Sequence, residues 1–273
     1  MQAFLRWTPP AGTLGTICHE AEARATVLEA RADELEREAS AVAAGPSLAA
    51  GLSGSDVRLI AEVKRRSPSK GSIAPTLDAP SQARAYVAGG AAAISVLTEP
   101  AHFAGSATDL REVRAEVSVP VLKKDFHLRP IQLVEARALG ASAALLIARA
   151  LSPDRLREMT ETARRLQLEV LVEVRDESEL ERALECGATI IGVNNRDLET
   201  LVIDPATAER IVPRIPSGLV AVAESGVSTR EDVERYAACG ADAVLVGSAI
   251  SAASDPTGAT RALVGVPRRS RGD

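Results

Sequence analysis

Residues 187–194 read GATIIGVN, a Gly-Ala pair followed by a short aliphatic run that ends on an amide side chain. A Gly-Ala pair stands before an aliphatic run at four places: Gly90-Ala91, Gly140-Ala141, Gly187-Ala188 and Gly240-Ala241. Their spacings of 50, 47 and 53 residues each correspond to two strand–helix units. Glycine suits a left-handed residue that ends a helix, and alanine lets the next strand approach closely.

Short aliphatic runs alternate with segments long enough for helices along the whole chain after residue 50. The runs lie at 58–64, 93–97, 119–124, 143–147, 169–174, 189–194, 218–223 and 241–246. This alternation indicates parallel strands joined by crossover helices. Eight such units with an internal repeat predict an α/β protein, a (β/α)8 TIM barrel. An open doubly wound sheet is the alternative, although the Gly-rich loop expected after its first strand is missing.

The first 50 residues differ in composition from the rest. Residues 14–44 are rich in Ala, Glu, Arg and Leu, which favour one helix, and Gly45-Pro46 would end it. We therefore predict a helical extension over residues 1–50 that packs on the barrel, and the barrel itself over residues 51–265. The basic end of the chain predicts a disordered tail over residues 266–273.

Composition excludes several classes of protein. The 273 residues are 46% hydrophobic and 25% charged with a net charge of −5, which excludes wholesale disorder. Only 2% are aromatic, so the core must be aliphatic. Few aromatics and mild acidity argue against a nucleic-acid partner.

The positions of the cysteines and histidines indicate the kind of cellular compartment and whether a metal site is expected. The three cysteines form no CxxC pair, and the three histidines form no cluster, so we expect a reducing compartment and no metal site. The sequence has no apolar stretch of the roughly 18 residues that span a membrane and no signal-peptide pattern. We expect a cytoplasmic protein without a membrane partner.

Polar side chains end five of the aliphatic runs. Barrel active sites lie at the carboxyl ends of the strands, so these side chains would meet in one cavity. They are Glu62, Lys64, Lys124, Glu173, Asn194 and Glu224. Carboxylates and ammonium groups in a dry pocket shift one another's pKa, which suits general acid–base chemistry. A purely structural ring of ion pairs is the alternative.

A second set of residues suggests a phosphate site. Gly226 follows the seventh run, and Gly247-Ser248 follows the eighth, where barrels often bind phosphate with backbone N–H groups. Two ordinary turns would also favour glycine. The basic loop at residues 65–72 is either a mobile lid over an anionic substrate or a solvated loop.

These motifs occur in an order that resembles one known family. The matching stretches are IAEVKRRSPSKG (60–71), SVLTEPAHFAG (95–105), VLKKDF (121–126), LVEV (171–174), IGVNNRDL (191–198) and AESGV (223–227). Over about residues 55–250 the chain resembles the indole-3-glycerol-phosphate synthase family of tryptophan biosynthesis. The resemblance implies a carbon–carbon lyase that closes the ring of 1-(o-carboxyphenylamino)-1-deoxyribulose 5-phosphate, releases carbon dioxide and water, and needs no cofactor.

The resemblance also implies catalytic roles. Lys124 would be the general acid that protonates the substrate carbonyl, and Glu173 would hold Lys124 and the developing hydroxyl. Glu62 and Lys64 would serve the final dehydration, with the identity of the last base left open. Lys64 and Asn194 would hold the benzoate carboxylate.

Binding roles follow in the same way. Glu224 and Ser225 would bind the sugar hydroxyls. The phosphate would meet Ser67, Arg196, Gly226, Gly247 and Ser248, and Pro68 is a further candidate substrate-binding residue. Candidate partners are the phosphorylated substrate and other enzymes of the tryptophan pathway.

Two physical expectations accompany this chemistry. An aryl substrate needs aromatic walls, so Phe103 and Phe126, at the ends of the second and third runs, should line the pocket. Protonation of a carbonyl near neutral pH calls for an ammonium of lowered pKa, which burial and a second lysine would provide for Lys124.

Two alternatives remain at this point. A non-catalytic phosphate-binding paralogue would show gaps in the catalytic set, and none is seen. A sister barrel isomerase of phosphoribosyl substrates would carry a thiol base at the end of strand one and an acid at strand six. Here Glu62, Lys64, Asn194 and Arg196 occupy those places.

Overall fold

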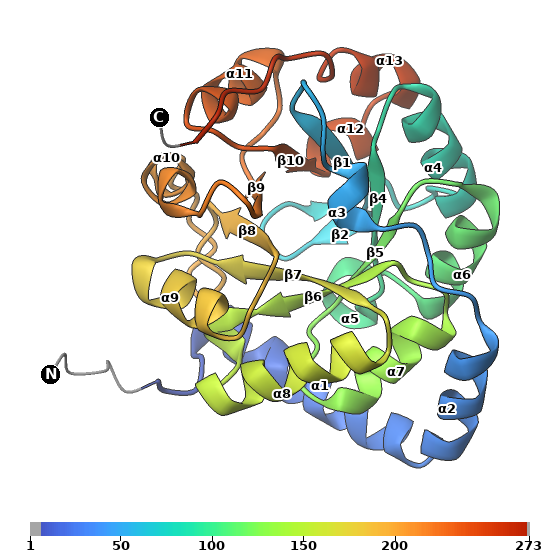
Figure 1. Ribbon diagram of the computed structural model, residues 1–273. Coiled ribbons are helices and arrows are strands. Elements are labelled where there is room, and N and C mark those ends of the chain that lie inside the picture. The colour runs from blue at the N-terminus through green and yellow to red at the C-terminus, as the bar shows by residue number, and fades with distance from the viewer. Residues whose placement is uncertain (1–6, 272–273) are drawn as a thin grey trace, which may run out of the picture.

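The computed structural model describes residues 7–271, in which eight parallel strands close into a barrel (Figure 1). The strands follow the ring in chain order, and the first pairs with the last, which closes the sheet. They are β1 (Arg58–Val63), β4 (Ala93–Leu97), β5 (Val121–Lys124), β6 (Ala143–Ile147), β7 (Glu169–Val174), β8 (Ile190–Asn194), β9 (Val220–Glu224) and β10 (Ala243–Val246). Each predicted run overlaps one of them, so the TIM-barrel prediction is confirmed.

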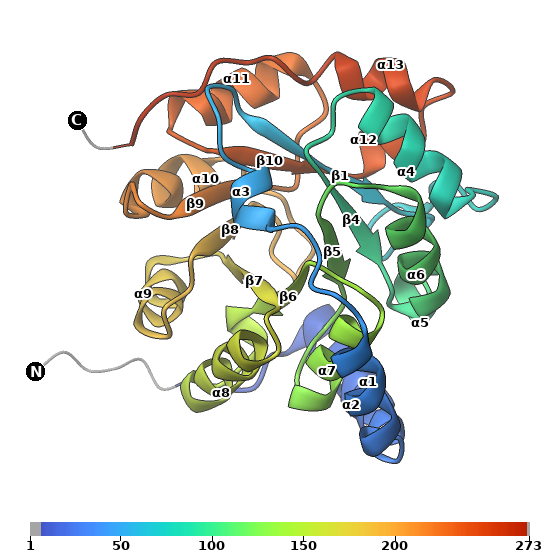
Figure 2. The ribbon, with the colours of Figure 1, turned by 45° about the vertical axis from the view of Figure 1, so that its right-hand side comes forward.

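Helices connect successive strands and surround the barrel (Figure 2). They are α4 (Ala79–Ala88), α6 (Ala107–Glu116), α7 (Pro130–Ala138), α8 (Pro153–Arg165), α9 (Glu177–Glu185), α10 (Ala206–Ile211) and α11 (Arg230–Ala238), and α13 (Pro256–Arg261) follows the last strand. The glycines of the four Gly-Ala pairs have φ of +75° to +103°, as predicted for residues that end a helix and turn the chain into a strand.

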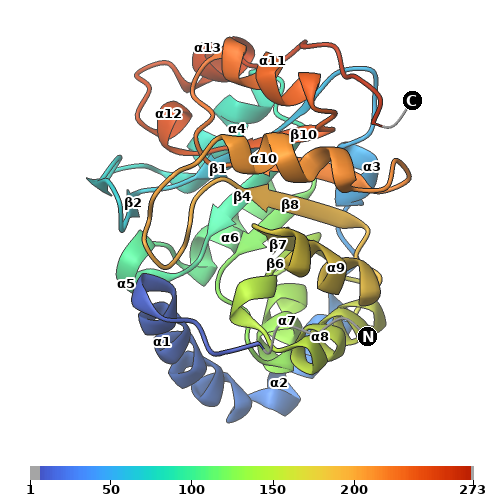
Figure 3. The same ribbon diagram turned by 90° about the vertical axis from the view of Figure 1, so that its left-hand side faces the viewer.

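The N-terminal segment forms two helices, α1 (Gly12–Glu29) and α2 (Ala32–Ala41), so the prediction of one helix over 14–44 was wrong. Both helices pack on α7 (Figure 3). Leu35 and Ala39 of α2 share one buried cluster with Ala25 of α1 and two residues of α7, whereas the first half of α1, from Leu14 to Ala21, packs on the main core of the barrel. The chain must turn between them to bury both faces, and helix propensity alone does not register that turn.

The amino end of the barrel is covered by the short helix α3 (Leu48–Gly51). The carboxylate of Glu169, the first residue of β7, accepts hydrogen bonds from the backbone N–H groups of Leu48 and Ala49 and from the Ser47 hydroxyl. Because α3 covers the amino end, the open end of the barrel is the one at the carboxyl ends of the strands.

The core is mainly Ala, Val, Leu and Ile, as expected from the composition. Two of the few aromatics are also fully buried. The Tyr86 hydroxyl pairs with Ser251, and the Tyr236 hydroxyl accepts a hydrogen bond from Asn195. Within residues 7–271, no helix has the length and apolar character to cross a membrane.

The tail over 266–273 was predicted to be disordered, and its described part differs from that prediction. Arg268 and Arg271 pair with the buried Asp242 at 2.8 and 2.6 Å, and Arg271 also donates to the Gly240 carbonyl. The buried Asp242 carboxylate attracts these two cations, and the ion pairs hold the C-terminal segment, up to Arg271, against the barrel. Residues 272–273 lie outside the described residues.

Candidate active site

A cavity of about 240 Å³ opens at the carboxyl ends of the strands. Every site residue named from the sequence lines it: Glu62, Lys64, Ser67, Pro68, Phe103, Lys124, Phe126, Glu173, Asn194, Arg196, Glu224, Ser225, Gly226, Gly247 and Ser248. Residues about 190 positions apart thus meet in one pocket because the parallel strands all end on the same side.

Glu62 and Lys64 form an ion pair where β1 ends. They lie two positions apart, so both side chains leave the strand on the same side, and Glu62 Oε1 is 2.5 Å from Lys64 Nζ. Burial alone would raise the pKa of Glu62, but the charges of Lys64 and Lys124 outweigh burial and lower this pKa. Glu62 is therefore ionised at neutral pH.

Lys124 lies between two buried carboxylates. Its Nζ is 2.8 Å from Glu224 Oε2 on β9 and 3.6 Å from Glu173 Oε2 on β7. The neighbouring Lys123 points to the other side of β5, away from the cavity, and pairs with Glu135 of α7 at 2.6 Å. Strand alternation thus puts one lysine of the pair into the cavity and the other between the barrel and its helix layer.

The prediction of a lowered pKa for Lys124 was wrong. Burial does act to lower it, but the negative charges of Glu224, Glu173 and Glu62 together outweigh burial and raise the pKa above its usual value. The second cavity lysine, Lys64, is paired with Glu62.

For the pKa of Glu224, in contrast to that of Lys124, the effect of burial outweighs the effect of the opposite charge. Burial raises its pKa to about 7, against the lowering effect of Lys124 and with a further rise from Glu173. Its Oε1 is buried and has no hydrogen-bond partner within the described residues. Gly192 of β8 makes room for this carboxylate, because a Cβ at that position would overlap Glu224 Oε1.

The turn after β9 is held in a left-handed conformation. Ser225 and Gly226 have φ of +65° and +81°, and the side-chain amide of Asn195 donates to the Ser225 carbonyl at 3.0 Å. A non-glycine residue seldom adopts this conformation, and such strain is concentrated at functional sites. Sequence reasoning did not name Asn195; the Asn-Asn doublet after β8 was its only signal.

The other loops of this side come from β1, β8 and β10. Ser67 belongs to a two-stranded hairpin of β2 (Arg66–Ser67) and β3 (Gly71–Ser72), and its hydroxyl accepts from the Lys70 N–H. Arg196 is half-buried, and burial lowers its pKa. Gly247 precedes α12 (Ser248–Ser251), and a Cβ there would overlap Glu62 Oε1. The Ser67 hydroxyl, the Arg196 guanidinium and the start of α12 thus belong to the lining of the same cavity.

Aromatic rings line another side. Phe103 ends α5 (Pro100–Phe103), Phe126 follows β5, and their ring centroids are 6.2 Å apart at 37°. Leu14 and Ile17 of α1 also line the cavity, a contribution from the N-terminal helix that the sequence did not reveal. These apolar groups suit the flat ring of an aryl ligand.

One group of potential metal ligands occurs among residues 7–271. Glu20, Glu99 and His102 each offer an atom within 4.8 Å of the others, although histidine spacing predicted no such cluster. The Glu99 oxygens already accept three backbone N–H groups at the start of α5. Helix capping therefore accounts for this carboxylate, and the group lies outside the cavity lining.

A closed (β/α)8 barrel with contacting lysines and glutamates in its cavity defines a TIM-barrel enzyme. The chain belongs to the indole-3-glycerol phosphate synthase family, whose family model matches residues 14–263. The alternatives of a non-catalytic paralogue and of a sister isomerase are not favoured by this match.

Individual relatives agree with the family. The chain is 54% identical over 208 residues to the indole-3-glycerol phosphate synthase of Nocardioides sp., covering 76% of this chain and 80% of that one. It is 47% identical over 257 residues to that of Mycobacterium ulcerans, covering 93% and 94%. Among solved structures, 3-hexulose-6-phosphate synthase from Salmonella typhimurium matches with a TM-score of 0.62 at 17% identity, over 76% of this chain and 96% of that one. This last likeness supports the fold alone.

Proposed function

We propose that the cavity binds 1-(o-carboxyphenylamino)-1-deoxyribulose 5-phosphate and converts it to indole-3-glycerol phosphate, carbon dioxide and water. Family membership gives the activity, that of a carboxy-lyase in tryptophan biosynthesis. One observation carries the residue assignments: the Lys124 ammonium contacts Glu224 and Glu173 in a cavity that also holds two phenylalanine rings.

Ring closure is assigned to Lys124. The aryl carbon that bears the carboxylate attacks the ketone carbon while Lys124 gives a proton to the ketone oxygen, which becomes a hydroxyl. The raised pKa keeps Lys124 charged in the free enzyme. Hydrogen bonds from sugar hydroxyls to Glu224 weaken the negative field around the ammonium, so Lys124 becomes a stronger acid once substrate is bound. Glu173 holds Lys124 and the new hydroxyl.

Decarboxylation and dehydration complete the reaction. The ring-closed intermediate is iminium-like, so the electron pair of the breaking carbon–carboxylate bond returns to the ring as carbon dioxide leaves. The hydroxyl then departs as water with a proton from Lys64, and the adjacent CH2 group loses a proton to a carboxylate. Glu62 suits that base because its lowered pKa keeps it ionised beside Lys64. The intermediate supplies its own electron sink, so the proposal calls for no cofactor.

Substrate recognition follows from the two charged ends of the molecule. Lys64 and Asn194 hold the benzoate carboxylate, and Phe103 and Phe126 flank the aryl ring. The sugar hydroxyls meet Glu224 and Ser225. The phosphate is assigned to Ser67, Arg196, Gly226, Gly247 and Ser248, and Pro68 lies beside them as a substrate-binding residue. Support comes from the serine hydroxyls, the Arg196 guanidinium and the glycine turns that line the cavity.

The cellular setting is also a proposal. Cys18, Cys186 and Cys239 are free thiols, which supports a reducing compartment such as the cytoplasm. Other enzymes of the tryptophan pathway remain candidate partners.

Turnover of the purified protein tests the function. The carboxyphenylamino substrate is added and indole fluorescence is followed. Wild type is expected to turn over, and Lys124→Ala to lose about 10³-fold in kcat with little change in melting temperature. Lys124→Arg keeps the charge but transfers no proton, so it should be similarly slow. Failure of the wild type would refute the function; full turnover of Lys124→Ala would refute the general acid.

A further inference from the structure

Two arginines form ion pairs between helix α1 and the barrel, and each set of ion pairs makes up one clamp. Arg24 reaches from α1 to the ends of β4 and β5, and Arg129, at the start of α7, pairs with Glu22 and Glu29 of α1. The two arginines are similarly exposed, at 28% and 32% of their side-chain surface. Only the Arg24 clamp lies next to residues of the cavity.

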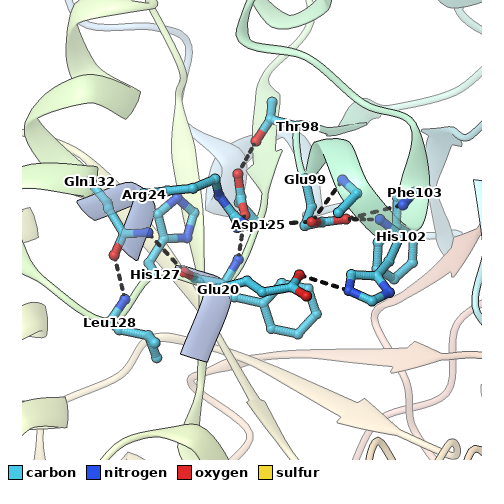
Figure 4. Close-up of polar contacts among 12 residues, drawn as sticks. Glu20, Arg24, Thr98, Glu99, His102, Phe103, Asp125, His127, Leu128 and Gln132 are labelled. Atoms are coloured by element: carbon cyan, nitrogen blue, oxygen red, sulfur yellow. Dashed lines mark hydrogen bonds and ion pairs between the residues drawn. The ribbon is translucent and has the colours of Figure 1, made fainter. Parts of the chain in front are cut away.

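Arg24 bridges two carboxylates that are almost completely buried (Figure 4). Its Nη2 donates to Asp125 Oδ1 at 3.0 Å, and its Nη1 donates to Glu99 Oε1 at 3.4 Å. The planar guanidinium can serve both acceptors at once, a geometry that a lysine ammonium on a flexible stem does not reproduce. Arg24 thereby links the loop after β4 to the end of β5.

Each of these carboxylates anchors the backbone of one cavity phenylalanine. Glu99 Oε2 accepts the N–H of Phe103 at 3.1 Å, and Asp125 Oδ1 accepts the N–H of Phe126 at 2.8 Å. Thr98 fixes the other Asp125 oxygen with a hydrogen bond of 2.6 Å. One hydrogen-bonded path from Phe103 to Phe126 therefore runs through the Arg24 guanidinium, beside the direct contact of Thr98 with Asp125.

Arg24 itself is absent from the residues that line the cavity, whereas both phenylalanines and Asp125 belong to them. It acts on the pocket only through its carboxylate partners. A second contact from α1 to the same loop, between Glu20 and His102 at 2.8 Å, supports the position of α5 but does not reach β5.

We propose that Arg24 is a positioning residue for the aryl end of the substrate, because it sets the spacing of Phe103 and Phe126 through Glu99 and Asp125. This inference rests on the proposed function, in which the two rings flank the substrate's aryl group. A ring held about 1 Å out of place loses much of its contribution to binding. The phosphate end of the cavity is built by β1, β8, β9 and β10 and has no contact with Arg24.

Ligand binding to Arg24→Ala, Arg24→Lys and the matched control Arg129→Ala tests the inference. Calorimetry with 2-aminobenzoate probes the aryl end, and calorimetry with inorganic phosphate probes the other end. In Arg24→Ala the Kd for 2-aminobenzoate should rise about tenfold, with an unchanged Kd for phosphate. Arg24→Lys keeps the positive charge near Glu99 and Asp125. Its Kd for 2-aminobenzoate should rise less than in Arg24→Ala, again with an unchanged Kd for phosphate. Arg129→Ala should bind both probes within about twofold of wild type.

Steady-state kinetics provide the second readout. Arg24→Ala should raise KM for the carboxyphenylamino substrate about tenfold while kcat changes less than about threefold, since Lys124 is left in place. Equal behaviour of Arg24→Ala and Arg129→Ala would overturn the inference. So would an equal loss of both probes, which would indicate general collapse of the pocket. Absence of turnover in the wild type would instead refute the function, so the two failures are distinguishable.

Discussion

Glu224 is a cavity carboxylate that titrates near neutral pH. Its pKa is raised to about 7 by burial, so it is protonated below that pH in the free enzyme. The proton removes an acceptor for the sugar hydroxyls and weakens the pair with Lys124. We therefore expect kcat/KM to fall as the pH drops below about 7, by about tenfold per unit.

The variant Glu224→Gln identifies the source of this pH dependence. Its amide does not titrate, so the acid limb of the kcat/KM profile should move to lower pH or flatten, at a lower plateau than wild type. The profile is measured from pH 5 to 9 with the fluorescence assay. An unchanged limb in Glu224→Gln would assign the titration to another group.

Gly192 makes the position of Glu224 possible. A Cβ at this position would overlap Glu224 Oε1 and lie 3.1 Å from Glu224 Cδ, so Gly192→Ala must displace the carboxylate from Lys124. We expect kcat/KM to fall about 100-fold in this variant. Gly218→Ala is the control, because a Cβ there meets no atom within 4 Å. Similar activity of the two variants would contradict this role for Gly192.

The site residues were predictable from the sequence, but their protonation was not. Polar side chains at strand ends, together with family motifs, named residues that all line the cavity, although the sequence did not point to Leu14 and Ile17 of α1. The pKa of Lys124 depends instead on three carboxylates that converge from three other strands. Sequence order carries no distances between strands, so the sign of that shift was missed.

Among the elements, the loop between β1 and α4 depends on one arginine. Arg65 makes a bidentate ion pair with Asp109 of α6, at 2.6 and 2.8 Å, and its Nε donates to the Leu77 carbonyl near the end of the same loop. This loop carries Ser67 and Pro68 to the cavity. Fixed at both ends, it holds these residues near the substrate.

The variant Arg65→Ala tests this element. The loosened loop should raise KM about tenfold and accelerate proteolytic cleavage within residues 66–77. Arg84→Ala is the control, since Arg84 also pairs with α6, through Glu116, but on the exposed surface. If Arg65→Ala and Arg84→Ala have the same KM and cleavage rate, the loop does not need this ion pair.

The strands were predictable as elements, and the N-terminal helices only in part. An aliphatic run buried on both faces is a strong local signal for a parallel strand. The break between α1 and α2 has no glycine or proline to mark it. It follows from the packing of α2 on α7, which is a tertiary effect that overrides local helix propensity.

At the scale of the whole molecule, the barrel closes where β1 pairs with β10. The C-terminal segment is bonded to the barrel next to this pair of strands. The Asp242 carboxylate, just before β10, accepts the Ala221 N–H at the start of β9 and pairs with Arg271 and Arg268. Arg271 is 3% exposed in its side chain and also donates to the Ile215 carbonyl. The C-terminal segment thus connects the last strands to the helix layer.

We expect Arg271→Ala to reduce the free energy of unfolding by about 2 kcal/mol, because the buried Asp242 loses a charged partner and keeps only Arg268. In thermal melts this corresponds to a decrease of about 5 °C for a chain of this size. Arg269→Ala is the matched control, since Arg269 is exposed two positions earlier, and its melting temperature should not change. Because the cavity lies at the opposite ends of these strands, kcat and KM of Arg271→Ala should match wild type at 25 °C. Equal melting temperatures for the two variants would show that the attached tail adds nothing to stability.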